Sequence, residues 1–188
     1  MVLIRLLGGA GATTDGGEPV DVGPAKCQTV LAVLALAVGS AVPVPRLIEL
    51  VWGGGPPRTA EKTLQSYVVR LRKGLGAAAI VRVGAAYRLD LKPESVDVAR
   101  FQQRLRSDDI EAALAEWTGT PLAGLEGHGL TPMVDALTEQ WLAAVEIDLQ
   151  RRLQTDPASI IGPLTELTAS HPYREHLWSL LMTLPGLG

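Results

Sequence analysis

The chain has 188 residues, a length that accommodates one large or two small domains. Hydrophobic residues make up 47% and charged residues 20%, so there are enough apolar side chains to bury a core, and intrinsic disorder is disfavoured. Because Cys27 is the single cysteine, a disulfide framework and a zinc site of clustered thiolates are excluded, which favours a reducing, cytoplasmic location. The longest apolar run, residues 29–38, is far shorter than the ~20 residues that span a bilayer, and we expect neither a membrane span nor a secretion signal.

The net charge of −3 hides a strong asymmetry along the chain. Residues 58–92 carry 8 basic and 2 acidic side chains, a net charge of +6. Residues 93–188 carry 6 basic and 14 acidic side chains, a net charge of −8. A compact basic block is typical of a nucleic-acid-binding surface, although a solvated helix face would have the same composition.

The first 55 residues predict strands followed by helices. Residues 2–7 are apolar and β-branched, which predicts a strand, and residues 19–22 predict a second short strand. The glycine-rich stretch between them, residues 8–17, lacks the Gly-Lys-Ser/Thr ending of a phosphate-binding loop, so we interpret it as a hairpin turn. Two helices that begin at prolines are predicted next, over residues 25–38 and 46–52.

A third helix, predicted over residues 59–75, has two chemically distinct faces. Its apolar side chains recur every three or four residues and form one stripe for burial, made of Leu64, Val68, Leu71 and Leu75. The opposite face mixes cations with short hydrogen-bonding side chains and is centred on Lys62, Ser66, Val69 and Lys73. Thr63 and Arg70 flank this face on one side, and Gln65 and Arg72 flank it on the other.

Residues 80–91 predict two strands around a turn at residues 84–86, a hairpin that carries Arg82 and Arg88. Strands, three helices and a basic hairpin, in this order, predict a winged helix-turn-helix. A helix fits the major groove of duplex DNA, and a basic hairpin beside it reaches the adjacent backbone or minor groove. Small basic helix-turn-helix units also make protein–protein contacts. The alternative is therefore an interaction module whose helical domain binds a partner while the winged helix is a scaffold.

The second half predicts an all-helical domain of paired antiparallel helices, similar to tetratricopeptide repeats. The predicted helices cover residues 97–106, 110–117 and 131–154, a segment that begins at Asp156-Pro157, and residues 173–184. Four tryptophans stand singly along the apolar stripes of the chain, so we expect them to pack in the core: Trp52, Trp117, Trp141 and Trp178.

Residues 52–75 read WGGGPPRTAEKTLQSYVVRLRKGL and resemble the antibiotic regulatory protein family of actinobacteria, the SARP family. The resemblance continues through VDVARF from residue 96, ALAEWTGTPLAGL from residue 113 and HPYREHLWSLLM from residue 171, which covers nearly the whole chain. It implies an α+β OmpR-type winged helix-turn-helix at residues 1–95 and an all-α bacterial transcriptional activation domain at residues 96–188. Because the family has further helices after the last of these motifs, we expect a C-terminally short helical domain.

The resemblance implies a sequence-specific transcriptional activator of a secondary-metabolite (antibiotic) biosynthesis cluster. Such a protein binds direct repeats in double-stranded promoter DNA as a dimer and recruits RNA polymerase through its sigma subunit. In OmpR-type proteins the first Arg of the Arg-Leu-Arg triplet reaches a base edge, and here this residue is Arg70. The residues that we expect to contact DNA are Arg58, Lys62, Thr63, Gln65, Ser66, Tyr67, Arg70, Arg72, Lys73, Arg82, Tyr87 and Arg88.

No group of residues in the sequence suggests catalysis, and we expect neither an enzyme nor a cofactor. The three histidines, His128, His171 and His176, are too scattered for a metal site, so we expect solvated or helix-capping roles. Cys27 lies near the start of an apolar helix and is expected to act as a small hydrophobic group.

Overall fold

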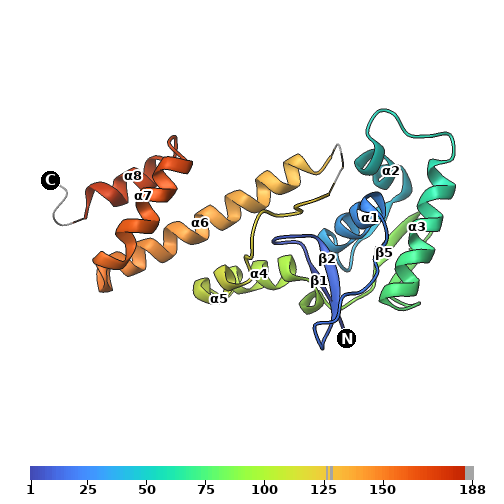
Figure 1. Ribbon diagram of the computed structural model, residues 1–188, viewed down its shortest axis with the longest axis horizontal. Helices are drawn as coiled ribbons and strands as arrows, with labels where there is room; N and C mark the ends of the chain where they lie inside the picture. The colour runs from blue at the N-terminus through green and yellow to red at the C-terminus, as the bar shows by residue number, and fades with distance from the viewer. Residues whose placement is uncertain (126, 128, 185–188) are drawn as a thin grey trace.

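The computed structural model describes residues 1–125, 127 and 129–184, which form an elongated molecule with its N-terminal elements at one end (Figure 1). The first half contains short strands, namely β1 (Val2–Arg5), β2 (Gly11–Thr14), β3 (Ala41–Pro43), β4 (Ile80–Val83) and β5 (Ala86–Leu89). It also contains α1 (Ala25–Leu36), α2 (Val44–Trp52) and α3 (Ala60–Leu75). The second half is helical, with η1 (Pro93–Ser95), α4 (Asp97–Arg106), α5 (Ile110–Ala115), α6 (Thr131–Thr155), η2 (Pro157–Ile160), α7 (Ile161–Ser170) and α8 (Glu175–Met182). The molecule therefore combines a mixed α/β part with a helical C-terminal part.

Helix α1 forms the centre of the N-terminal part. Its sequence is apolar on nearly all sides, and every residue from Thr29 to Ala35 is buried, as expected of a helix with neighbours on all faces. Helices α2 and α3 pack against it, and so does β5, the middle strand of the antiparallel sheet β3-β5-β4. Strand β3 is too short to be predicted from the sequence, and it pairs with β5 from Ala41↔Arg88 to Pro43↔Ala86.

The glycine-rich stretch after β1 is not the hairpin turn that the sequence suggested. Residues Gly11–Thr14 form β2, which pairs antiparallel with β1 from Val2↔Thr14 to Arg5↔Gly11. The segment predicted as the second strand, residues 19–22, makes only an isolated bridge, Thr13↔Pro19. The prediction was wrong because Thr13 and Thr14, rather than the later valines, find strand partners on β1.

A buried carboxylate joins the end of β1 to the helical half. Asp97, at the start of α4, accepts hydrogen bonds from the backbone N–H groups of Leu6 (2.7 Å) and Leu7 (2.9 Å), and from that of Val98 (2.7 Å). Burial raises the pKa of Asp97, and these three hydrogen bonds oppose that effect. The segment Leu6–Leu7 also contacts Thr118, whose backbone N–H and side-chain hydroxyl both donate to the Leu7 carbonyl.

The apolar core does not divide at residue 95. One continuous cluster runs from Ile4 through the N-terminal helices to Phe101, Leu130 and Leu137 of the second half. A second cluster includes Leu149 and joins the far end of α6 to α7 and α8. Helix α6 contributes to both clusters and connects the two ends of the molecule (Figure 1).

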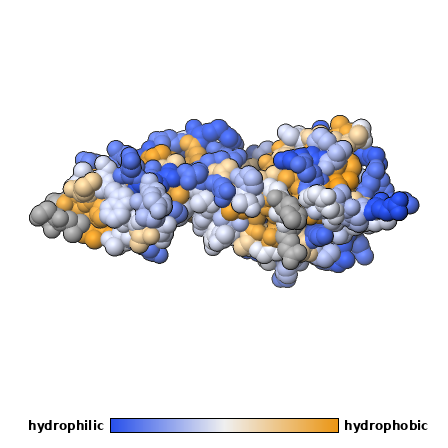
Figure 2. All heavy atoms as spheres, turned by 90° about the horizontal axis from the view of Figure 1, so that it is seen from above, coloured by the Kyte–Doolittle hydropathy of each residue, from blue (hydrophilic) through white to orange (hydrophobic). Residues whose placement is uncertain are grey.

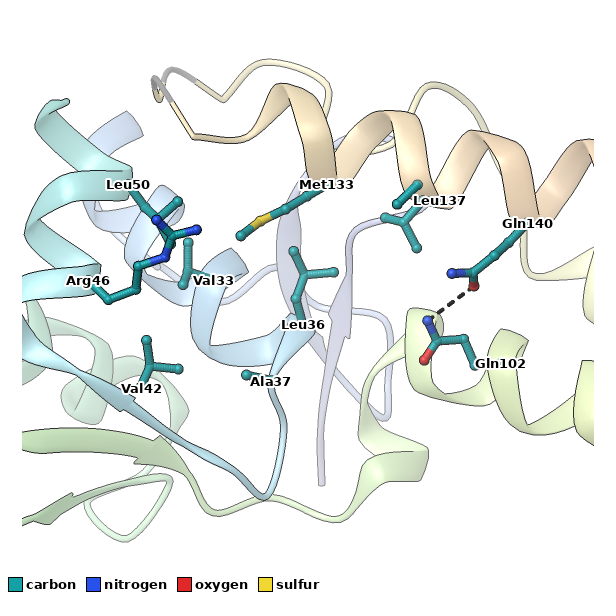
Figure 3. A pocket seen from close by; sticks show the side chains of 11 residues that line it. Val33, Leu36, Ala37, Val42, Arg46, Leu50, Gln102, Met133, Leu137 and Gln140 are labelled. Carbon is teal, nitrogen blue, oxygen red and sulfur yellow. Dashed lines mark hydrogen bonds between the residues drawn. The ribbon is translucent and has the colours of Figure 1, made fainter.

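A cleft of about 320 Å³ lies where the start of α6 approaches α1 and α2 (Figure 3). Leu36 of α1 and Met133 and Leu137 of α6 point into it. At one end the amide of Gln102 on α4 donates to the side-chain oxygen of Gln140 on α6 at 3.2 Å. Apolar packing of α6 on α1 and α2 therefore joins the two halves, and the polar contact between α4 and α6 holds the helical half together beside it.

Near the C-terminus the structure corrects two details. Asp156-Pro157 begins the 3-10 turn η2 rather than α7, and the Asp156 side chain caps neither element. Trp178 is 41% exposed and donates its Nε1–H to the Pro172 carbonyl at 2.9 Å, so it is not a core residue. Trp117, by contrast, packs on Phe101 and stacks on Trp141 with ring centroids 5.5 Å apart, as the apolar stripes predicted.

Candidate nucleic-acid interface

Helix α3 separates a buried seam from an exposed face, as its sequence pattern predicted. Leu64, Val68 and Leu71 are fully buried against the core. Val69, on the opposite side, is 64% exposed. This arrangement fixes the rotation of the helix, so the side chains opposite the seam face solvent. We call the exposed set the cationic face of α3; it comprises Lys62, Gln65, Ser66, Val69, Arg70 and Lys73.

Two lysines of this face are unpaired in the part of the chain that the structure describes. Lys62 and Lys73 are exposed and have no carboxylate within ion-pair distance there. Arg58, in the loop before α3, is likewise exposed. These positive charges are free to attract an anionic partner.

The hydroxyls along α3 donate to the helix itself. Ser66 Oγ donates to the Lys62 carbonyl at 3.1 Å, and Thr63 Oγ1 donates to the Thr59 carbonyl at 3.0 Å. Each oxygen keeps its acceptor lone pairs. Ser66 and Gln65 are exposed, whereas Thr63 is half-buried. The face thus offers amide and hydroxyl groups between its cations.

Arg70 has a carboxylate partner that the sequence did not reveal. Its Nη2 donates to Asp21 Oδ2 at 3.0 Å, across 49 residues of sequence. The N–H of Gly23 donates to the other oxygen, Oδ1, at 2.8 Å. The hydrogen bond from Gly23 and the contact with Arg70 lower the pKa of Asp21, so its carboxyl is charged near neutral pH.

The hairpin after α3 holds the remaining cations. Arg82 is exposed at the end of β4, and its Nε donates to the Gly84 carbonyl at 3.1 Å. Arg88, on β5, is half-buried and pairs with Asp90 at 2.9 Å. Arg72 is also half-buried, and its Nε donates to the Ile80 carbonyl at 2.8 Å, which ties α3 to β4. All three arginines therefore have partners within the protein, and the exposed Arg82 guanidinium also lies over the Tyr87 ring, 5.9 Å from its centroid.

The two tyrosines of the predicted set differ in burial. Tyr87 is only 4% exposed and belongs to the core, so the expectation that it contacts DNA is wrong: β5 is the middle strand, and the Tyr87 side faces the helices. Tyr67 is half-buried and stacks on Trp52 with ring centroids 6.1 Å apart. This stack joins α3 to the end of α2.

The exposed cations of α3 and the β4–β5 hairpin lie at one end of the molecule (Figure 1). Figure 2 shows hydrophilic and apolar side chains at both ends, including apolar patches at the end that carries α7 and α8. Tyr173 and Met182 are exposed in that distant region.

Among the described residues, no three His, Cys, Asp or Glu side chains gather closely enough to hold a metal ion. His128 lies outside the described residues, while His171 and His176 are 5 positions apart on either side of the start of α8. Over the same ranges, no helix is both long and apolar enough to cross a membrane.

Comparison with known proteins places the molecule among transcriptional regulators. Residues 95–184 match the bacterial transcriptional activator domain family. The chain is 30% identical over 188 residues to the regulatory protein DnrI of Streptomyces peucetius, which covers 84% of this chain and 68% of that protein. The chain belongs to the SARP family of transcriptional activators.

Longer relatives match over part of their length. EmbR, a transcriptional regulatory protein of Mycobacterium tuberculosis, is 35% identical over 200 residues, which is 95% of this chain and 51% of EmbR. A solved structure of EmbR in complex with a low-affinity phosphopeptide superposes with a TM-score of 0.88 at 32% identity, over 97% of this chain and 54% of that one. The chain therefore spans about half the length of EmbR, and the phosphopeptide is a ligand of that protein.

Proposed function

We propose that residues 1–95 form a winged helix-turn-helix that binds double-stranded promoter DNA, with α3 in the major groove. The observation that carries this proposal is the cationic face of α3, where Lys62 and Lys73 are exposed opposite a fully buried seam. An α-helix of 16 residues fits a major groove about 12 Å wide. Cations on its outer side then meet phosphates or guanine edges, and Gln65 and Ser66 meet other base edges.

The β4–β5 hairpin acts as the wing in this proposal. Arg82 is exposed beside the turn, and a hairpin next to a groove-bound helix reaches the neighbouring backbone or minor groove. The tie from Arg72 to the Ile80 carbonyl supports a fixed angle between α3 and the hairpin. Contacts of this kind position the protein and carry little sequence information.

The helical half, residues 96–188, serves activation rather than DNA binding. With a net charge of −8 over residues 93–188, it repels the phosphate backbone. We propose that it contacts RNA polymerase through the sigma subunit, while two copies bind direct repeats as a dimer, as in other family members. The regulated genes are those of a secondary-metabolite (antibiotic) biosynthesis cluster.

Two measurements test the proposal. First, duplexes are selected from a random library with the full chain, and affinity for the selected duplex is measured from low to moderate salt. A protein that neutralises several phosphates loses affinity steeply, with a log–log slope of about −0.9 per phosphate. Affinity that does not change with salt would contradict DNA binding. Second, transcription by RNA polymerase in vitro from a promoter carrying the selected repeats should rise when the full chain is added.

A further inference from the structure

We propose that Asp21 is a specificity-determining residue that holds Arg70 in position to read a base, an inference that rests on the proposed DNA binding. Asp21 lies in the loop before α1, far from α3 in the sequence. The structure brings it to the edge of the cationic face, where it is the acidic partner of Arg70.

The contact is part of a closely fitted loop rather than a chance surface pair. Gly23 has a φ of +83°, which L side chains rarely adopt, and its N–H turns back to Asp21 Oδ1. A Cβ at Gly23 would lie 2.9 Å from Arg70 Cδ and 3.1 Å from Cys27 Sγ. The side-chain amide of Gln28 also donates to the Gly23 carbonyl at 2.8 Å, which anchors the loop to α1.

On α3, Gly74 leaves room for the loop that carries Asp21. A Cβ at Gly74 would lie 2.4 Å from the backbone carbonyl oxygen of Asp21, so only glycine allows the loop to approach the helix this closely. Glycine is a poor helix former, so its presence inside α3 is accounted for by this close approach. The loop and the helix therefore pack closely at the position where the Asp21 carboxylate contacts Arg70.

The geometry leaves Arg70 able to bind a second acceptor. The bond to Asp21 uses Nη2, and the planar guanidinium has five N–H donors in a rigid fork. Arg70 itself lines an open depression of about 550 Å³, together with Asp21, Ser66, Val69 and Lys73. A guanine edge in this depression offers the two acceptors, O6 and N7, that such a fork binds together.

Asp21 should then raise the affinity for the correct DNA sequence and lower the affinity for other sequences. On the correct sequence it holds the guanidinium in place, so less side-chain freedom is lost when the base is bound. On other sequences its negative charge offsets that of Arg70 and repels phosphates, which weakens non-specific binding. Both effects raise the ratio of specific to non-specific affinity.

The test compares Asp21→Asn with the unaltered full chain on two duplexes, one selected by the protein from a random library and one of scrambled sequence. Asparagine keeps the acceptor for the Gly23 N–H but removes the charge. We expect affinity for the scrambled duplex to rise about two- to fivefold, because a surface charge interaction is lost. Affinity for the selected duplex should fall about two- to tenfold, because Arg70 is no longer held.

Asp15→Asn is the matched control, since it removes one charge from a nearby loop where the partner is the N-terminal amine. It should change both affinities by the same factor. In an Arg70→Ala background, Asp21→Asn should no longer lower affinity for the selected duplex. Cys27 lies against Gly23, and unchanged reactivity of its thiol shows that the loop remains folded.

Equal shifts on both duplexes would overturn the inference, because they would mean that Asp21 acts only as a general negative charge. That outcome leaves the proposed function intact. If instead the unaltered chain binds no duplex in a salt-dependent way, the proposed function itself fails. The two failures are therefore distinguishable in one set of titrations.

Discussion

At the scale of single residues, Arg70 and Lys73 are one turn apart on the cationic face but differ in their partners. Arg70 is held by Asp21, whereas Lys73 has no ion pair within the described ranges. A fixed guanidinium suits a directional contact with a base, and a flexible ammonium suits a phosphate. In the proposed complex with DNA, we therefore expect Arg70 to read a base and Lys73 to supply general attraction.

Arg70→Ala should lower affinity for the selected duplex about ten- to a hundredfold, because a bidentate contact with guanine supplies ~1–3 kcal/mol of discrimination. Binding to scrambled DNA should fall only about two- to fivefold, since a single positive charge beside Asp21 is lost. Fluorescence anisotropy at one salt concentration measures both. Arg70→Lys, which keeps the charge but not the fork, should resemble the alanine variant on the selected duplex. Equal losses on the two duplexes would identify Arg70 as a backbone contact.

Cys27 shows how the core behind the interface controls reactivity. Burial raises the pKa of its thiol to about 11, and the Sγ lies 3.6 Å from the Tyr67 carbonyl. Only about one thiol in a thousand is then ionised at pH 8. We expect negligible alkylation of the native protein at pH 8, a rate that rises about tenfold per pH unit, and rapid reaction in denaturant. Rapid labelling of the folded chain at pH 7 would contradict the burial of this residue.

At the scale of elements, the two faces of α3 separate stability from binding. Lys62→Ala and Lys73→Ala leave the seam untouched, so they should not change the free energy of unfolding by more than about 0.5 kcal/mol. Each should flatten the slope of log affinity against log salt by about 0.9, on selected and scrambled duplexes alike. Arg106→Ala on α4 removes a charge from an exposed position outside the interface and serves as the control. An unchanged slope for both lysine variants would place the phosphate contacts elsewhere.

Asp97 contributes to stability, because its carboxylate joins the residues after β1 to the start of α4 by hydrogen bonds. Asp97→Ala would leave the buried N–H groups of Leu6 and Leu7 without an acceptor. Each unsatisfied buried donor costs about 1–3 kcal/mol, so we expect a loss of at least about 2 kcal/mol in urea unfolding. Asp135→Ala, at an exposed site on α6, should change stability by less than about 0.5 kcal/mol. Similar stabilities of the two variants would mean that the segment finds other acceptors.

At the scale of the whole molecule, features with a local signal were predictable from the sequence. The buried seam of α3 follows from its periodicity, and the hairpin at residues 80–89 follows from β-branched runs around Gly84. The long helix α6 was predicted to within one residue at its end, as expected of a long periodic segment.

Contacts between distant segments were not predictable in this way. The Asp21–Arg70 pair joins residues 49 apart, and the Leu6–Asp97 bond joins residues 91 apart. The candidate interface was therefore predictable as a helix face, but the partners that distinguish its cations were not.

Helix α6, with 25 residues, is about 37 Å long, and its two ends belong to different apolar clusters. A continuous helix holds its two ends in a fixed relative orientation. In the proposed complex, α7 and α8 are therefore turned in a fixed direction relative to the DNA groove that α3 would enter. Activation should then depend on the rotational phase of the binding site along the duplex. Inserting about 5 base pairs between site and promoter, half a helical turn, should abolish activation in vitro, and inserting about 10 should restore part of it. Equal activation at both spacings would mean that the helical half reaches the polymerase from any side of the DNA.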